Sequence, residues 1–346
     1  MTPGFIRRLF VGRNQRDVGL AEPAVHAEFG YLPAAIAFGS SDCGLKRQNN
    51  EDCYLCLPER LLYCVFDGMG GMACGERASD EARRVVEEYL TDDVIRQAVQ
   101  IGPVQVAQLF ESVLLEANNK LLTLAAADAS LSGMGTTAVL AIISGSMLYC
   151  SNLGDSRSYV LHDKSLVQIS EDHSVAAESV ARGEMTAEQS RKHPHRNRLT
   201  RCLGRAQCFL PSFNAINIHP GDRILLCSDG LWDMLADREI EQVLNSSSSV
   251  ETAVRVLINL ANRAGGADNI TAIVVAVPDN AGRDAMRLET ADVETLEADE
   301  LYQLPVLDPA KENIVPDQQI DDFAAAAAIN TDAQLPLTDL TDEWDK

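Results

Sequence analysis

Short apolar runs bounded by polar turns predict a chain rich in β-strands. Residues 62–66 are all apolar and end at Asp67, where a glycine-rich turn begins; this pattern is typical of a buried strand. Residues 54–57 precede that run across a short turn at Pro58, which predicts a hairpin. Similar runs predict further strands over residues 32–38, 138–143, 147–151, 158–161, 166–169, 213–218, 223–227 and 270–277.

Two longer stretches between the strand groups indicate helices. Apolar residues recur at intervals of three and four over residues 104–126, directly after Pro103, which predicts an amphipathic helix. Residues 75–90 are rich in helix formers and predict another. Shorter helices are expected over residues 237–244 and 250–264. Helices grouped between runs of strands predict an α+β fold in which helices pack on sheet.

Composition divides the 346 residues into one folded domain and two terminal segments. The chain is 46% hydrophobic, which is ample for a sizeable core. Its net charge of -22 is concentrated near the end, where residues 279–346 hold 18 acidic and 4 basic residues. We expect a domain over residues 33–279 with a mobile flap at 174–198, a loosely ordered extension over 1–32, and an acidic, largely disordered tail over 280–346.

Charge and cysteine usage exclude several functional classes. The acidic charge argues against binding to nucleic acid or to an anionic membrane surface. No run approaches the roughly 18 apolar residues of a membrane span. The nine cysteines form no disulfide framework, and the six histidines are not clustered at ligand spacing, which disfavours zinc. We expect a cytoplasmic monomer with reduced thiols, with an Arg-rich transit peptide at the start as the alternative.

Acidic residues recur at the ends of the expected strands. Asp67 and Asp229 each follow an apolar run and precede a glycine. Others lie beside strand ends in turns or loops: Glu51, Asp52, Asp155 and Asp268. A single Asp in a turn is commonplace, so a solvated turn residue is the alternative for Asp67. Carboxylates gathered at strand ends would repel one another unless cations lay between them, and the hard ions Mg²⁺ and Mn²⁺ are their natural partners.

Eight short motifs in a fixed order are highly specific, although each alone is weak. They resemble those of the metal-dependent protein serine/threonine phosphatases of the PP2C (PPM) family, in its bacterial form. The matching segments are Arg47-Gln48-Asn49-Asn50-Glu51-Asp52, Asp67-Gly68-Met69-Gly70-Gly71, Gly135-Thr136-Thr137, Asn152-Leu153-Gly154-Asp155-Ser156-Arg157, Asp172-His173-Ser174, Leu199-Thr200-Arg201-Cys202-Leu203-Gly204, Ser228-Asp229-Gly230-Leu231 and Asp268-Asn269-Ile270-Thr271.

The resemblance implies a four-layer α-β-β-α sandwich, in which two packed antiparallel sheets are flanked by helices and a two-metal site lies at one end. By position, Asp67 matches the residue that bridges two Mn²⁺ or Mg²⁺ ions. The carbonyl of Gly68 matches a ligand of one of them. Asp229 and Asp268 match the residues that complete the shell of the first metal.

The remaining site residues are also implied by the resemblance. Glu51 and Asp52 match residues that hold metal-bound waters, with direct metal contact as a further role for Asp52. Asn269 matches a supporting residue beside the ligands. Asp155, together with Asp229, matches a third-metal site. Arg47 matches the arginine that grips the substrate phosphate, a task that suits a bidentate guanidinium.

The implied activity is hydrolysis of phosphoserine and phosphothreonine on proteins by a metal-activated water, in opposition to a Ser/Thr kinase. No phosphoenzyme is expected. A pseudophosphatase that binds phosphoproteins without turnover is the alternative, although degenerate members usually lose some of the carboxylates. A two-metal nuclease is opposed by the acidic charge and by the lack of a basic groove.

The chain departs from many relatives at two positions. Met69 and Met72 stand where relatives often carry histidine, so the sequence assigns no proton donor to the leaving group. His173 is expected to hold a turn through backbone hydrogen bonds, with a catalytic role as the alternative. His193 and His195 are expected to be solvated in the flap, with a contact to substrate as the alternative. Cys74 is interpreted as a packing residue at a helix start, with a redox-sensitive thiol as the alternative. The acidic tail is expected to be solvated, with a docking role or autoinhibition at Arg47 as the alternative.

Overall fold

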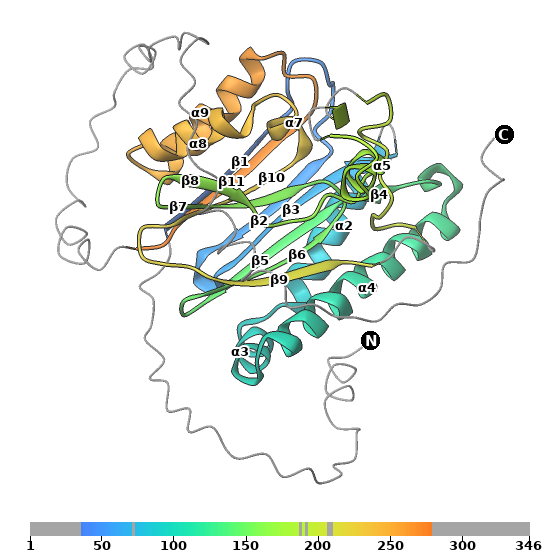
Figure 1. Cartoon of the computed structure of the whole chain (residues 1–346). Coiled ribbons are helices and arrows are strands. Elements are labelled where there is room, and N and C mark those ends of the chain that lie inside the picture. The colour runs from blue at the N-terminus through green and yellow to red at the C-terminus, as the bar shows by residue number, and fades with distance from the viewer. Residues whose placement is uncertain (1–35, 71–72, 187–188, 191–192, 206–209, 279–346) are drawn as a thin grey trace, which may run out of the picture. The chain divides into compact units, whose positions relative to one another are not determined.

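Two antiparallel β-sheets pack face to face, and helices cover both outer faces (Figure 1). The computed structural model describes residues 36–70, 73–186, 189–190, 193–205 and 210–278. Every strand pairing among these residues is antiparallel. The α+β four-layer sandwich implied by the sequence motifs is therefore confirmed.

The first sheet has five strands in the order β1-β11-β10-β7-β8. Their bounds are β1 (Ile36–Asp42), β11 (Ile270–Ala276), β10 (Arg223–Cys227), β7 (Arg157–His162) and β8 (Ser165–Gln168). The central strands β10 and β11 are almost fully buried, which explains their continuous apolar sequences.

The second sheet has the order β2-β3-β5-β6-β9, with the short strand β4 paired to β3. The bounds are β2 (Asp52–Leu57), β3 (Leu62–Met69), β4 (Gly135–Thr136), β5 (Ala138–Ser144), β6 (Met147–Leu153) and β9 (Ser212–Asn217). Strands β2 and β3 form the predicted hairpin, and a 3-10 turn (Pro58–Arg60) joins them.

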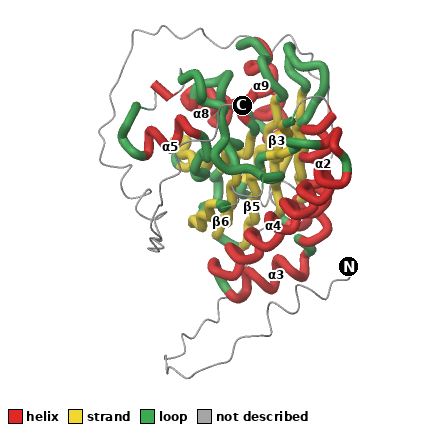
Figure 2. Tube along the Cα trace, turned by 90° about the vertical axis from the view of Figure 1, so that its right-hand side faces the viewer, coloured by secondary structure: helices red, strands yellow, loops and turns green. Residues whose placement is uncertain are grey.

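Three helices pack on the second sheet, and another three pack on the first. The first group comprises α2 (Ala73–Tyr89), α3 (Asp92–Ile101) and α4 (Pro103–Ala127); Figure 2 shows α2 and α4 beside β3 and β5. The second group comprises α7 (Asp229–Trp232), α8 (Asp237–Ser246) and α9 (Val250–Arg263). A short helix, α5 (Val175–Ala181), begins the long connection between β8 and β9. Within the described ranges, no helix is long and apolar enough to cross a membrane.

The apolar residues form three separate layers, and each layer contains one buried cysteine. Cys64 lies between the second sheet and helices α2 to α4, Cys150 lies between the two sheets, and Cys227 lies between the first sheet and helices α7 to α9. Burial raises the pKa of each of these thiols. They act as small apolar side chains, as the sequence indicated.

Most predicted elements form within a few residues of their expected bounds, and several differ. Strand β1 runs to Asp42, beyond the expected end of this strand at residue 38, because the segment pairs along its whole length with β11. Strand β3 continues past Phe66 to Met69, because β4 pairs with its last residues. Helix α3, the short helix α7 and the two-residue strand β4 were not predicted. The expected terminal extension and acidic tail lie outside the described residues.

Candidate metal centre and phosphate site

The acidic residues singled out in the sequence lie at one end of the sandwich. Side chains alternate along β3, so that Leu62, Cys64 and Phe66 face the helices while Tyr63 and Val65 face the other sheet. The same alternation directs Asp67 between the two sheets. Asp67 is also the cross-strand partner of Asp52, the first residue of β2.

The other carboxylates reach this end from different elements. Asp229 begins α7 directly after β10, and Asp155 lies in the turn between β6 and β7. Asp268 lies in the loop before β11. The charges of Asp52, Asp155, Asp229 and Asp268 all raise the pKa of Asp67, so the sequence-predicted acids form one electrostatic cluster.

Burial and mutual repulsion oppose ionisation of this cluster. Burial is the largest cause that raises the pKa of Asp67 and of Asp155 well above the usual range. Burial, reinforced by Asp268 and Asp52, raises the pKa of Asp229 to about 7. Burial raises the pKa of Asp52 to about 6, even though two hydroxyl hydrogen bonds act in the opposite direction. Among the described residues, no positive group is a main cause that offsets these effects at Asp67 or Asp229.

Two buried oxygens of the cluster lack a hydrogen-bond partner. Oδ1 of Asp52 and Oδ1 of Asp229 are fully enclosed and accept no hydrogen bond from the described residues. Unpaired buried carboxylate oxygens are costly, and oxygen ligands are those that Mg²⁺ and Mn²⁺ prefer. The residues present therefore fit divalent metal ions.

The second oxygen of Asp52 is held by two hydroxyl groups. Ser228 and Thr271 donate hydrogen bonds of 2.7 and 2.6 Å to Oδ2 of Asp52. Both hydroxyls are fully buried. They fix the orientation of the carboxylate and leave Oδ1 for another partner. Neither residue was predicted from the sequence to belong to the site, although each stands in a motif beside a predicted ligand.

Two glycines allow the loops of the site to approach closely. The backbone at Gly68 packs against the carbonyl oxygens of Glu51 and Gly75, so a Cβ atom at this position would collide with both. Gly230 packs against the carbonyl of Asn269 in the same way. The Gly68 carbonyl, one of the predicted ligands, therefore belongs to a strand end that only glycine can form.

Asn269 clamps the loop that precedes β2 to the loop that precedes β11. Its Oδ1 accepts a hydrogen bond from the backbone of Glu51, and its Nδ2 donates to the carbonyls of Asn49 and Cys43. Through these contacts it sets the position of Glu51 relative to Asp268. Burial is the first cause that raises the pKa of Glu51, while Arg47 acts in the opposite direction.

Arg47 lies at the edge of the cluster, with half of its side chain exposed. Its guanidinium forms an ion pair of 2.6 Å with Oδ2 of Asp268. The positive charge of Arg47 also opposes the rise in the pKa of Asp52. The structure thus places a partly exposed guanidinium next to the acidic cluster.

The turn that carries Asp155 is held from both sides. The indole Nε1 of Trp232 donates a hydrogen bond of 2.9 Å to the Asp155 carbonyl. Arg157 stacks over the Trp232 ring at 3.7 Å and forms a forked ion pair with Asp172. Nδ1 of His173 accepts a hydrogen bond from the backbone of Gly154, so this histidine holds the turn as expected.

Methionine stands at the two positions where the family resemblance led to an expectation of histidine. Met69 ends β3 and has no proton to donate, and Met72 lies outside the described residues. His173 is buried, and burial together with Arg201 lowers its pKa to about 4. His193 and His195 lie in the flap segment, where His195 is exposed. Cys74 donates a hydrogen bond to the carbonyl of Ser130.

Sequence comparison connects the chain to characterised bacterial proteins. The protein phosphatase 2C family profile matches residues 46–274. The "Serine/threonine phosphatase stp" of Listeria welshimeri is 34% identical over 252 residues, which cover 72% of this chain and 95% of that protein. The "Protein phosphatase PhpP" of Streptococcus pneumoniae is 34% identical over 242 residues, which cover 68% and 95%.

Solved structures agree with the sequence comparison. The Mycobacterium tuberculosis serine/threonine phosphatase PstP/Ppp is similar with a TM-score of 0.64 and 32% identity, over 70% of this chain and 99% of that chain. The catalytic domain of PstP in complex with two manganese ions is similar with a TM-score of 0.61 and 31% identity, over 71% and 99%.

Proposed function

Because the chain belongs to the protein phosphatase 2C family and is a metal-dependent protein serine/threonine phosphatase, we propose that its catalytic centre is the acidic cluster around Asp67. The observation that carries the proposal is the pair of buried, unpartnered oxygens of Asp52 and Asp229 within a cluster of five carboxylates. Such a cluster needs cations to be ionised at neutral pH.

We propose that two Mn²⁺ or Mg²⁺ ions, the metals preferred by carboxylate sites, are held mainly by Asp67, the carbonyl of Gly68, Asp229 and Asp268. The Mn²⁺ complex of the related PstP domain supports this choice. When bound, such a metal pair supplies an activated water as the nucleophile. Asp67 would be the bridging residue of the proposal, because Asp52, Asp155, Asp229 and Asp268 all raise the pKa of its carboxyl.

The remaining acids have supporting roles in the proposal. Glu51 and Asp52 hold and orient water at the centre, and Ser228 and Thr271 fix the Asp52 carboxylate for this task. Asn269 positions Glu51. Asp155, together with Asp229, forms a third metal site, consistent with the effect of the Asp229 charge on the pKa of Asp155.

Arg47 binds the phosphoryl group of the substrate. Its planar guanidinium suits bidentate contact with two phosphate oxygens, and its partial exposure leaves it accessible to a phosphoprotein. Contact with phosphate would replace the ion pair with Asp268. Its positive charge would then stabilise charge that develops on the phosphoryl oxygens during in-line attack by water.

The wider role follows from this chemistry. A phosphatase that acts on phosphoserine and phosphothreonine opposes a Ser/Thr kinase, and we propose that this chain does so as a monomer in the cytoplasm. The retained acidic cluster and the relatives named as phosphatases favour turnover over a pseudophosphatase that only binds.

The test is phosphate release from a phosphothreonine peptide with Mn²⁺, with Mg²⁺ and with EDTA. We expect metal-dependent release, and a loss of about 100-fold or more in Asp229→Asn, because this change removes a metal ligand. Asp93→Asn, at an exposed site on α3, is the matched control and should keep full activity. Activity that is insensitive to EDTA, or full activity in Asp229→Asn, would contradict the proposed centre.

A further inference from the structure

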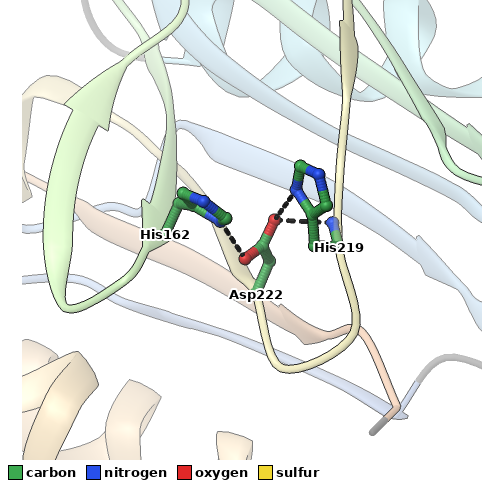
Figure 3. A group of neighbouring side chains, drawn as sticks. All are labelled: His162, His219 and Asp222. Atoms are coloured by element: carbon green, nitrogen blue, oxygen red, sulfur yellow. Dashed lines mark hydrogen bonds and ion pairs between the residues drawn. The ribbon is translucent and has the colours of Figure 1, made fainter. Parts of the chain in front are cut away.

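A second group of potential metal ligands lies at the opposite ends of β7 and β10 from the acidic cluster. His162 is the last residue of β7, and His219 and Asp222 belong to the turn that leads from β9 into β10 (Figure 3). Five residues of β10, at about 3.3 Å per residue, separate this turn from Asp229, so the two groups are about 20 Å apart.

The three side chains converge on one carboxylate. Nδ1 of His162 lies 2.7 Å from Oδ1 of Asp222, and Nδ1 of His219 lies 3.7 Å from Oδ2. The two imidazole rings are 4.8 Å apart, and one ligand atom from each of the three residues falls within 4.8 Å of the others. Figure 3 shows both rings on the two sides of the Asp222 carboxylate.

The position of the Asp222 carboxylate is fixed, because the residue is only 3% exposed and its backbone is hydrogen-bonded. Its carbonyl accepts a hydrogen bond from Val277, which in turn accepts one from Gly221. Its Oδ2 accepts a hydrogen bond of 2.8 Å from the backbone of His219. The turn is therefore ordered around the carboxylate, whereas the His219 side chain is 54% exposed and can adjust.

The second nitrogen of His162 also has a suitable neighbour. Nε2 of His162 lies 3.5 Å from the carboxylate of Asp163, which is 93% exposed. A histidine that binds a metal through one ring nitrogen commonly gives the proton of the other to a carboxylate. His162 is placed for this arrangement, with Nδ1 toward Asp222 and Nε2 toward Asp163.

A pocket gives solvent and ions access to the group. It has a volume of about 450 Å³, and its lining includes His162, His219, Asp222 and Lys164. The Arg223 guanidinium, which also belongs to the lining residues, donates hydrogen bonds to the carbonyls of Leu244 and Ser247.

We propose that His162, His219 and Asp222 form a second metal site that binds Zn²⁺. Two neutral imidazoles and one carboxylate are ligands that zinc accepts, with water as the fourth ligand. Tetrahedral bonds of about 2.0–2.1 Å require ligand atoms about 3.3 Å apart, which a small shift of the His219 ring and a slight opening at His162 achieve. The ion joins the β7–β8 turn to the β9–β10 turn and stabilises the folded state.

The site differs from the acidic cluster in ligand type. Imidazole nitrogen favours zinc, whereas an all-oxygen site favours Mg²⁺. The full-length protein is therefore first saturated with Mg²⁺, and Zn²⁺ is then titrated by calorimetry and by the shift in melting temperature. We expect one added Zn²⁺ to bind and to raise the melting temperature, because it binds only the folded state.

His219→Ala is the decisive variant, because its side chain is exposed and its loss does not open the core. We expect it to weaken Zn²⁺ binding by about 100-fold or more and to abolish the melting shift, with Mg²⁺-dependent phosphatase activity unchanged. His195→Ala, which removes an exposed histidine of the flap, is the matched control and should bind Zn²⁺ normally. Equal Zn²⁺ binding by the unaltered protein and by His219→Ala would overturn the site and leave the proposed phosphatase centre untouched.

Discussion

Thr271 donates a hydrogen bond of 2.6 Å to Oδ2 of Asp52, although 219 positions separate the two residues. The contact joins β11 of one sheet to the first residue of β2 in the other. Thr271 also shares a hydrogen bond of 2.7 Å with Ser41 on β1. A buried hydroxyl thus aligns a carboxylate of the proposed centre from the opposite sheet.

Thr271→Val removes this hydroxyl and preserves the shape of the side chain. We expect the Mn²⁺ concentration for half-maximal phosphatase activity to rise about tenfold, because a supporting contact orients a ligand group. The rate at saturating Mn²⁺ should change little. Thr123→Val on the exposed side of α4 is the control, and an unchanged Mn²⁺ requirement in Thr271→Val would show that the contact does not support metal binding.

Asp67→Asn should show how much the acidic cluster lowers the free energy of unfolding when no metal is bound. In EDTA at about pH 8, we expect the variant to be more stable than the unaltered protein by about 1 kcal/mol or more, because burial and four neighbouring acids make the Asp67 carboxyl costly to bury, whether it is ionised or takes up a proton. In Mn²⁺ the order should reverse, since the variant has lost a proposed ligand. Urea unfolding in EDTA and in Mn²⁺ measures the free energy of unfolding under the two conditions. A less stable variant in EDTA would contradict the repulsion argument.

Arg157→Lys should destabilise the turn at Asp155. Lysine keeps the positive charge. It loses the paired hydrogen bonds from the guanidinium to Asp172 and the stacking of the planar guanidinium on the Trp232 ring. Because the side chains of this pair are only 12% and 10% exposed, we expect the free energy of unfolding to fall by about 2–4 kcal/mol. Arg255→Lys, in an exposed pair with Glu251, should cost less than about 0.5 kcal/mol. Equal losses in the two variants would refute the special role of the Arg157 pair.

His173 should make stability depend on pH. Burial and Arg201 lower its pKa from 6.5 to about 4, so the unfolded chain binds a proton at this residue more readily than the folded protein does. The stabilisation is complete above pH 6.5 and is lost as the pH falls toward 4, with a total of about 3 kcal/mol.

His173→Asn tests this dependence, because the asparagine oxygen can still accept the hydrogen bond from Gly154. We expect the variant to lose less stability than the unaltered protein between pH 6.5 and 4 in urea unfolding. Parallel curves over this interval would assign the acid sensitivity to other groups.

The sequence predicted strands and site residues best where a single apolar run ends directly in an acidic residue. The apolar run that ends at Asp67 predicted both the strand and a charged residue at its end, and the same pattern located Asp229. Helix α3 was missed although its sequence carries a helical signal: Asp92 and Asp93 stand in its first turn, and its apolar residues, which include Ile95 and Ala98, fall on one face. Strand β1 was placed too early, since its polar residues belong to a strand only through pairing with β11.

Contacts between distant residues could not be predicted. Nothing in the local sequence of Asp52 indicates that Ser228 and Thr271 will hold its carboxylate. The histidines were judged too scattered for a metal site, yet the antiparallel return of the chain brings His162 and His219 to one carboxylate. Such sites arise from the order of strands in a sheet rather than from spacing along the chain.

The distribution of the buried cysteines makes the protein a natural reporter of its own unfolding. Cys64, Cys150 and Cys227 each occupy a different apolar layer, and burial keeps all three as unreactive thiols. Alkylation of a given thiol therefore records the opening of one particular layer. Mass spectrometry of the labelled peptides can establish whether the helical layers separate before the two sheets do, without any engineered probe.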